Sequence, residues 1–215
     1  MVDCGEDWLG RVEAIRPDAI IITHGHPDHA FGLKNGAPCP VYATSETWQN
    51  IARFPIAERR VIAPGKAFRA VGLTVRPYAL VHSTRAPAVG YRMTHGRISA
   101  FYVPDVVYIK ERTRALHGCR LYIGDGATII RSMVRRRREE LFGHVPISTQ
   151  LTWCAKEAVP EAIFTHCGTQ IVAGDGRKLG ALIRGLARDR GLAAARIAHD
   201  GMRLNLGQPC PSLTA

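Results

Sequence analysis

Four potential metal ligands lie close together in the segment THGHPDHAFGL, residues 23–33. They are His24, His26, Asp28 and His29. Imidazole nitrogens and carboxylate oxygens are the ligands that a divalent cation such as Zn²⁺ prefers. The apolar run Asp18–Ile22 precedes the segment, and Pro27 suits the first position of a helix that would carry Asp28 and His29. The spacing favours a site for two metal ions over the alternative, a histidine-rich turn that binds none.

Two metal ions need more ligands than these residues supply, so the interpretation requires further His or Asp side chains downstream. Three candidates each follow a predicted strand: His82 in LVHSTRAP, Asp105 in VPDVV and His166 in FTHCGTQ. We expect their loops to converge on one edge of a sheet. For His82 and His166 the alternative is a buried histidine bonded to a backbone carbonyl. Asp105 has the alternative of starting a helix as its N-cap.

The elements that must position these residues are indicated by hydrophobic periodicity. Predicted strands cover Asp18–Ile22, Pro40–Ala43, Leu73–Leu80, Ala88–Met93, Arg97–Val103, Arg120–Gly124, Glu161–Thr165 and Ala195–Ala198. Predicted helices cover Gly5–Ile15, Ser45–Phe54 with Ser45 as N-cap, Val106–Gly118, Ile147–Val159 and Asp175–Gly191. Hairpin-like strands fill the middle, and strand–helix pairs flank them. This order predicts an α/β fold with two sheets between helical layers.

The composition is that of a globular protein with a single domain over residues 1–215: 46% of the residues are hydrophobic and 22% charged. Six cysteines lie far apart without a C-x-x-C pair, which predicts reduced thiols. No run approaches the roughly 20 apolar residues of a membrane span, and the first residues lack a signal-peptide pattern. We therefore expect a cytoplasmic protein without a membrane partner.

The net charge is +11, carried mainly by arginine, whose fork of donors suits an anionic substrate. The alternative is a basic surface that only aids solubility. Four successive arginines, Arg135 to Arg138, precede Glu139 and Glu140. This pattern predicts a solvated helix with pairs at i and i+4. The alternative is that one or two of these arginines follow a phosphate backbone.

The ligand pattern as a whole, H-x-H-x-D-H and then a single His, Asp and His, resembles the metallo-β-lactamase fold superfamily over nearly the whole chain. The resemblance implies a four-layer αββα sandwich. It implies that one metal ion is held by His24, His26 and His82 and a second by Asp28, His29 and His166, with Asp105 bridging them. The start MVDCGEDW resembles the strand of that family that ends in D-x-G, which implies that Asp3 and Gly5 lie near the floor of the site.

A site of this kind implies hydrolysis. Two divalent cations lower the pKa of a shared water to about 7, so that a bridging hydroxide is the nucleophile. The cations also polarise the substrate and stabilise the charge of the transition state. Asp28 and Asp105 are therefore catalytic candidates as well as ligands. The His-rich set favours two Zn²⁺ ions, with Mn²⁺ or iron as alternatives.

The substrate class follows from the branch of the superfamily. True β-lactamases of this fold usually carry a cysteine where this chain has Asp105. The segment RRRREELFGHVPISTQLTW resembles that of transfer-RNA 3′-processing nucleases and cyclic-phosphate phosphodiesterases, which implies that His144 contacts the scissile phosphate or aids the leaving group. Those relatives commonly carry Ser where this chain has Pro146, and the alternative for His144 is a loop histidine.

We expect a phosphodiesterase that acts on a small-molecule phosphodiester or on RNA. The first alternative is a lactonase or β-lactamase-like hydrolase of cyclic esters or amides. The second is a non-catalytic, metal-stabilised module that binds nucleic acid.

The resemblance also implies that the chain begins within the D-x-G strand and lacks the first N-terminal strands of the fold. Either the reading frame is truncated, or the exposed sheet edge pairs with another copy of the chain. We therefore expect a homo-oligomer.

Overall fold

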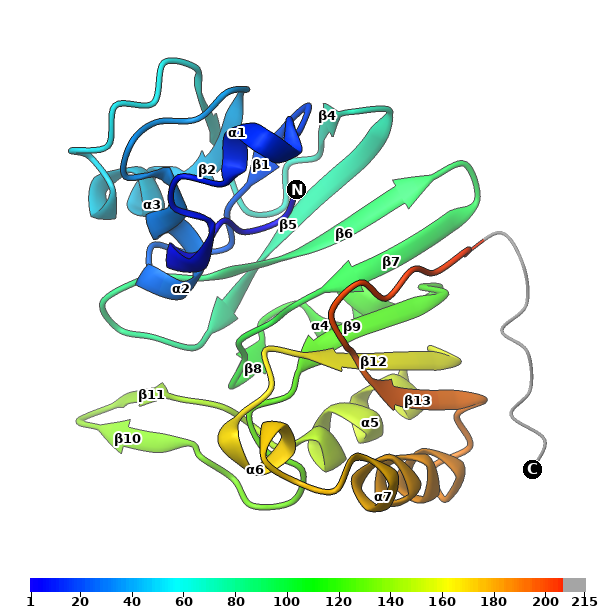
Figure 1. Cartoon of the computed structure of the whole chain (residues 1–215). Coiled ribbons are helices and arrows are strands. Elements are labelled where there is room, and N and C mark those ends of the chain that lie inside the picture. Colours follow the sequence, from blue (N-terminus) through cyan, green and yellow to red (C-terminus); the bar gives the residue numbers. More distant parts are fainter. Residues whose placement is uncertain (207–215) are drawn as a thin grey trace.

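A computed structural model describes residues 1–206 of the chain. A small parallel sheet has the order β1 (Ile20–Ile21), β2 (Val41–Thr44) and β3 (Arg59–Ile62). Its helices α1 (Val12–Ile15), α2 (Pro27–Ala30) and α3 (Ser45–Asn50) lie beside it, in blue in Figure 1. Because side chains alternate along a strand, Ile20 and Ile22 pack towards the helices, whereas Ile21 packs against the second sheet.

The second sheet is larger, with the order β13-β12-β9-β7-β6-β5-β4, and β8 (Tyr108–Ile109) pairs with β5. Its antiparallel part comprises β4 (Phe68–Ala70), β5 (Leu73–Val81), β6 (Val89–His95) and β7 (Ile98–Tyr102). Its parallel part continues through β9 (Leu121–Asp125), β12 (Glu161–Thr165) and β13 (Ala194–Ile197). The predicted hairpin-like centre is thus confirmed.

The two sheets pack face to face between helical layers, as the sequence predicts. Side chains of β5 and β6, among them Val75 and Tyr91, meet Ile21 between the sheets. The outer face of the large sheet packs against α4 (Arg112–Leu116), α5 (Ile147–Lys156) and α7 (Gly176–Arg188), of which α5 and α7 lie beneath the sheet in Figure 1. The layers are therefore helix, sheet, sheet and helix.

Three predicted helices differ from the structure. The predicted helix Gly5–Ile15 is a 3₁₀ turn, η1 (Glu6–Trp8), and the separate α1, with Gly10 in a left-handed conformation between them. The predicted helix Val106–Gly118 contains strand β8, and only α4 is helical. The N-cap of α3 is Thr44, whose side chain accepts from the Thr47 amide, and not Ser45.

The arginine run is not a helix. Strand β10 (Arg135–Arg137) pairs with β11 (Glu140–Phe142), and Arg138 takes the left-handed conformation of the turn. The opposite charges of Arg137 and Glu140 face one another across the hairpin, which favours pairing of the strands. The hairpin projects from the body of the fold at lower left in Figure 1.

The predictions about the cysteines and about membrane-spanning segments can be compared with the structure. The five cysteines within residues 1–206 are free thiols, whereas Cys210 lies outside the described residues. Within the same residues no helix is both long enough and apolar enough to cross a membrane.

Candidate metal centre

The structure brings all seven predicted metal ligands to one edge of the two sheets. His24 and His26 lie in the loop after β1, and Asp28 and His29 lie in α2, which begins at Pro27 as predicted. The other three directly follow or lie shortly beyond strands of the large sheet, namely β5 (His82), β7 (Asp105) and β12 (His166). Loops from both sheets therefore supply the site.

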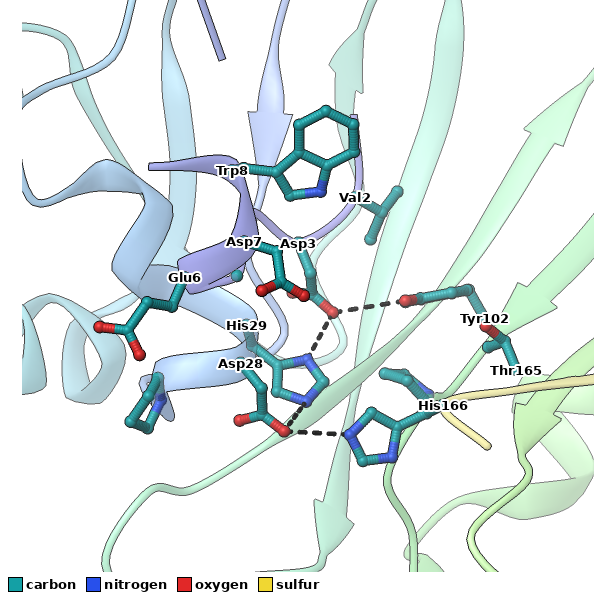
Figure 2. A pocket seen from close by; sticks show the side chains of 13 residues that line it. Val2, Asp3, Glu6, Asp7, Trp8, Asp28, His29, Tyr102, Thr165 and His166 are labelled. Carbon is teal, nitrogen blue, oxygen red and sulfur yellow. Dashed lines mark hydrogen bonds and ion pairs between the residues drawn. The ribbon is translucent and has the colours of Figure 1, made fainter. Parts of the chain in front are cut away.

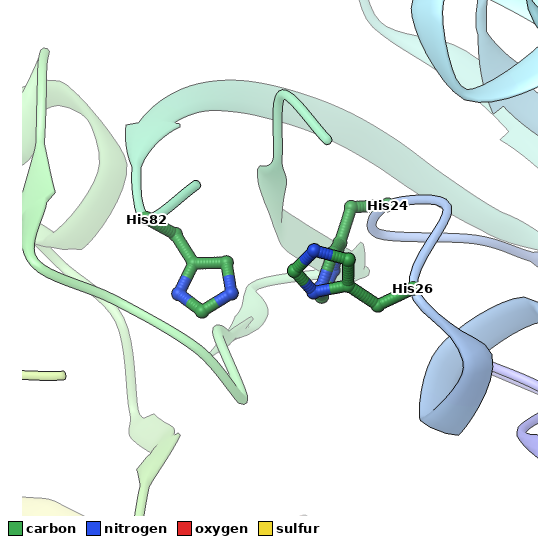
Figure 3. Close-up of side chains that lie close together, drawn as sticks. All are labelled: His24, His26 and His82. Carbon is green, nitrogen blue, oxygen red and sulfur yellow. The ribbon is translucent and has the colours of Figure 1, made fainter. Parts of the chain in front are cut away.

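Three histidines form a first cluster. One ring nitrogen from each of His24, His26 and His82 lies within 4.8 Å of the others. Figure 3 shows that the His82 ring extends towards the two other rings from the opposite side. The Nε2 atom of His24 lies 2.9 Å from Nδ1 of His26.

Asp28, His29 and His166 form a second cluster beside the first. The Asp28 carboxylate lies 3.0 Å from Nε2 of His166. Figure 2 shows the rings of His29 and His166 pointing towards this carboxylate. Asp105 lies between the clusters: Oδ2 is 2.7 Å from Nε2 of His29 and 3.5 Å from Nε2 of His24. Its Oδ1 is 3.1 Å from Nδ1 of His166. A carboxylate in this place has an oxygen within reach of both clusters.

A second layer of contacts fixes the orientation of the rings. The Nδ1 atom of His29 lies 2.9 Å from the Asp3 carboxylate, that of His24 lies 3.0 Å from the Thr23 hydroxyl, and that of His82 lies 3.1 Å from the Gly143 carbonyl oxygen. These contacts occupy Nδ1 and leave Nε2 directed at the centre. Such outer partners orient metal-binding histidines and fix the tautomer.

Asp3 and Gly5 lie at the floor of this site. Asp3 also accepts from the backbone amide of Thr23, at 2.7 Å. A side chain at Gly5 would collide with the backbone carbonyl of Asp28, so only glycine allows η1 to approach α2 so closely. Asp3 and His166 both adopt left-handed backbone conformations, with φ of 57° and 53°. Strain of this kind concentrates at functional sites.

The donor set fits divalent metal ions. Among the described residues, three buried side-chain atoms lie close to other ligands but form no well-aligned hydrogen bond, namely Nε2 of His29, Oδ1 of Asp105 and Nδ1 of His166. Buried polar groups without a partner are costly unless something else satisfies them. All three atoms belong to the clusters, and a cation at the centre would satisfy their lone pairs once the rings are unprotonated.

The two clusters differ in the pKa values of their histidines. Burial lowers the pKa of His24 and of His82, so both rings stay neutral and able to bind a cation. Burial also lowers the pKa of His29, but contacts with Asp105, Asp28 and Asp3 outweigh it and raise the pKa to about 12. The second cluster thus holds a positive charge among carboxylates, a place that a metal ion takes by displacing the proton.

His144 lies beside the clusters and is held by Asp125, a residue outside the predicted ligand set. Its Nδ1 is 2.8 Å from the carboxylate of Asp125, which is fully buried and accepts from the amides of Val106 and Ala127. Burial lowers the pKa of His144, but Asp125 outweighs it and the pKa is raised. Asp125 is the last residue of the apolar strand β9, and a carboxylate at the end of a strand was the signal available in the sequence.

The structure also bears on the alternative roles of Asp105, His82 and His166, namely a helix cap and histidines bonded to a backbone carbonyl. Asp105 is buried and is followed by β8, so it caps no helix. His82 does contact a backbone carbonyl oxygen, but only through Nδ1. His166 is part-exposed and contacts carboxylates rather than a carbonyl.

Two cavities open beside the clusters, and His166 lines both. The first, of about 500 Å³, has carboxylates in its wall and Trp8 at its rim (Figure 2). The second, of about 880 Å³, is lined by Arg131, Arg135, His144 and the hydroxyl groups of Thr128, Ser132 and Thr169, and no carboxylate lines it. The site therefore lies between an acidic cavity and a cationic one.

Comparison with known proteins places this geometry in a family. The family model described as a beta-lactamase superfamily domain matches residues 1–167, which include all seven predicted ligands. Among curated relatives, a ribonuclease Z of Methanopyrus kandleri is 30% identical over 57% of this chain and 50% of its own. An octanoyltransferase of Porphyromonas gingivalis is 23% identical over 77% of this chain and 36% of its own. The chain thus spans half or less of the length of these relatives.

Solved structures share the fold. The metallo-beta-lactamase fold protein YhfI from Bacillus subtilis superimposes with a TM-score of 0.68 at 18% identity, covering 94% of this chain and 84% of the other. A diphosphatase from the PhnP family gives a TM-score of 0.67 at 21% identity, covering 94% and 77%. This chain therefore shares its fold with both solved structures.

Proposed function

We propose that this chain, which belongs to the beta-lactamase superfamily, is a dinuclear metal-dependent phosphodiesterase with one domain over residues 1–215. The observation that carries the proposal is the cationic cavity beside the two clusters. Arg131 and Arg135 line it together with His144 and His166, and no described carboxylate forms an ion pair with either guanidinium. A phosphodiester is anionic, whereas a lactone or a β-lactam ring is not, and unpaired guanidinium groups suit phosphate oxygens.

The ligand assignment extends the cluster geometry. His24, His26 and His82 would hold one metal ion, Asp28, His29 and His166 the other, and Asp105 would contact both. Two divalent ions supply a water of lowered pKa as nucleophile and neutralise charge on the phosphoryl oxygens when they are bound. Histidine and carboxylate ligands suit Zn²⁺, and Mn²⁺ or iron accept the same set.

The protein's own side chains perform the remaining steps. Because Asp125 holds Nδ1 of His144 and raises the pKa of the ring, the imidazolium form is favoured, in which Nε2 has a proton to donate to the leaving oxygen. Arg131 and Arg135 bind the charged part of the substrate beside this proton donor. Asp3 keeps Nδ1 of His29 bonded, so its Nε2 faces the centre.

Turnover of bis(p-nitrophenyl) phosphate by metal-loaded protein tests the proposal. We expect hydrolysis that Asp105→Ala abolishes, with a phosphodiester cleaved faster than a lactone or nitrocefin. Arg136→Ala is the control for a substitution outside the site, because Arg136 lies on the same hairpin as Arg135 but does not line the cavity. Protein with two metal ions per chain that leaves every phosphodiester intact would refute the proposal.

The leaving-group role of His144 has its own test. A good leaving group such as p-nitrophenolate departs without a proton, whereas an alkoxide requires one. We therefore expect His144→Gln to slow the cleavage of an alkyl phosphodiester by about 10²-fold or more and that of the p-nitrophenyl ester much less. An equal loss with both substrates would assign His144 to binding instead.

A further inference from the structure

A second cationic cavity lies away from the metal ligands, on the outer face of the large sheet. Its volume is about 620 Å³, within the range of small-molecule sites. Its wall consists of Arg76, Arg92, Arg114 and His117, together with three threonines and Tyr78. The charged donors are the three arginines, whereas the Tyr78 and Thr113 hydroxyl groups already donate to the Arg114 oxygen and to Glu157. No carboxylate of residues 1–206 lines the cavity.

Two of the arginines face one another directly. Arg76 on β5 is the cross-strand partner of Arg92 on β6, so both side chains lie on the same face. Like charges in directly opposed positions destabilise a sheet. Neither guanidinium forms an ion pair with a carboxylate in residues 1–206, whereas the third arginine, Arg114, pairs with Glu111. The paired strands therefore hold two uncompensated positive charges side by side.

Both guanidinium groups are fixed by backbone carbonyls. Arg76 donates to the Gly65 oxygen at 2.8 Å, and Arg92 donates to the His117 oxygen at 2.9 Å, at the end of α4. Arg76 uses one terminal nitrogen in this contact and keeps the other N–H donors of its fork for a ligand. Arg92 keeps fewer, because Nη1 also lies 3.3 and 3.5 Å from the Arg114 and Ala115 oxygens and Nη2 lies 3.5 Å from the Ser99 hydroxyl. Because the groups are already ordered, an anion that bridges them loses little side-chain entropy on binding.

We infer that this cavity binds a small phosphorylated molecule, with its phosphate group between Arg76 and Arg92. The site is separate from the metal centre: Arg76 lies six positions before His82, which directly follows β5, or roughly 20 Å away at about 3.3 Å per residue. The phosphate neutralises the opposed charges, and Thr74, Arg114 and His117 line the space for the rest of the ligand. The inference is independent of the hydrolytic function.

Hydrogen–deuterium exchange of the metal-loaded protein, with pyrophosphate or 5′-AMP as the probe, tests this inference. We expect each probe to slow exchange in residues 112–119, which border the cavity and contain no proposed metal ligand. Arg76→Gln should remove this protection, and calorimetry should show the affinity of the cavity falling about tenfold or more. Protection near His24 and metal content should stay unchanged, because phosphate bound at the metal centre does not depend on Arg76.

Two further variants make the outcome decisive. Arg97→Gln is the control, since Arg97 is exposed in the neighbouring β6–β7 turn and does not line the cavity. Arg114→Ala alters an exposed side chain and should weaken binding without affecting folding. Protection that persists in Arg76→Gln, or is absent from the wild type, would overturn the inference. Protection by a short oligoribonucleotide but by neither small probe would also overturn it, in favour of a path for a nucleic-acid strand.

Discussion

Asp3→Asn tests whether a carboxylate outside the ligand set controls the second metal site. Oδ1 of Asp3 accepts from the Thr23 amide at 2.7 Å, and Oδ2 contacts Nδ1 of His29 at 2.9 Å. Asparagine has one acceptor oxygen for these two donors. The Thr23 amide is fixed in the backbone, so the oxygen goes to it and the NH₂ group faces His29. The ring must then accept at Nδ1 and carry its proton on Nε2, the atom directed at the metal.

The expected cost follows from this change of tautomer. The loss of an outer partner of this kind typically weakens metal binding about 10- to 100-fold. That factor corresponds to about 1.4–2.8 kcal/mol, which matches the loss of one hydrogen bond to a charged group, about 1.5–3 kcal/mol. Backbone strain does not contribute, because asparagine tolerates the left-handed conformation of Asp3 as well as aspartate does.

Competition with a chromophoric chelator, together with metal content per chain, measures the effect. We expect one of the two metal ions to bind more weakly in Asp3→Asn, while the ion at His24, His26 and His82 keeps its affinity. Asp7→Asn is the control, since Asp7 is an exposed carboxylate of the same cavity wall that contacts none of the ligands. Wild-type affinity for both ions in Asp3→Asn would refute the argument.

Three further predictions concern packing, substrate charge and metal removal. Gly5→Ala should lower the free energy of unfolding by about 1–3 kcal/mol, because the new methyl group overlaps the Asp28 carbonyl. Chemical denaturation measures this free energy, and an unchanged midpoint would contradict the prediction. Arg135→Ala should raise KM for phosphodiesters more than kcat falls, whereas Arg136→Ala should change neither; steady-state kinetics that fail to separate the two variants would count against the cationic cavity. Removal of metal with a chelator should lower the melting temperature, because an ion present at about 1,000 times its Kd stabilises the folded state by about 4 kcal/mol per site. Calorimetry with and without added Zn²⁺ measures this shift. No shift would show that the centre binds no metal.

The ligand positions were accessible from the sequence because they depend on local order. Four of them lie within one short segment, and the other three lie shortly after strands whose apolar runs are easily recognised. Where strands end together at one edge, their loops meet, so the expectation that His82, Asp105 and His166 converge needed no knowledge of the pairing. The prediction of Ser45 as N-cap was wrong by one residue, because Thr44 has an equivalent hydroxyl at the preceding position.

The contacts that depend on tertiary structure were not accessible. The contact between Asp125 and His144 joins residues whose spacing carries no pattern, and it forms only because β9 and the loop before α5 meet. The arginine run has helical propensity, but Arg138 at the turn and the pairing of Arg137 with Glu140 make it a hairpin. Tertiary pairing overrides propensity in so short a segment.

Each ligand cluster takes members from both sheets, so a bound ion would fasten two layers that are otherwise joined by packing and by hydrogen bonds such as that from the Val89 amide to the Thr23 oxygen, at 3.0 Å. His24 and His26 belong to the loop after β1, whereas His82 belongs to the end of β5. The Tyr91 hydroxyl, fully buried on β6, donates to the Ile22 oxygen at 2.6 Å and fixes how one layer sits on the other. The distance between the proposed metal ligands therefore depends on contacts deep between the sheets, so substitutions there should alter the reaction although they change no residue of the site.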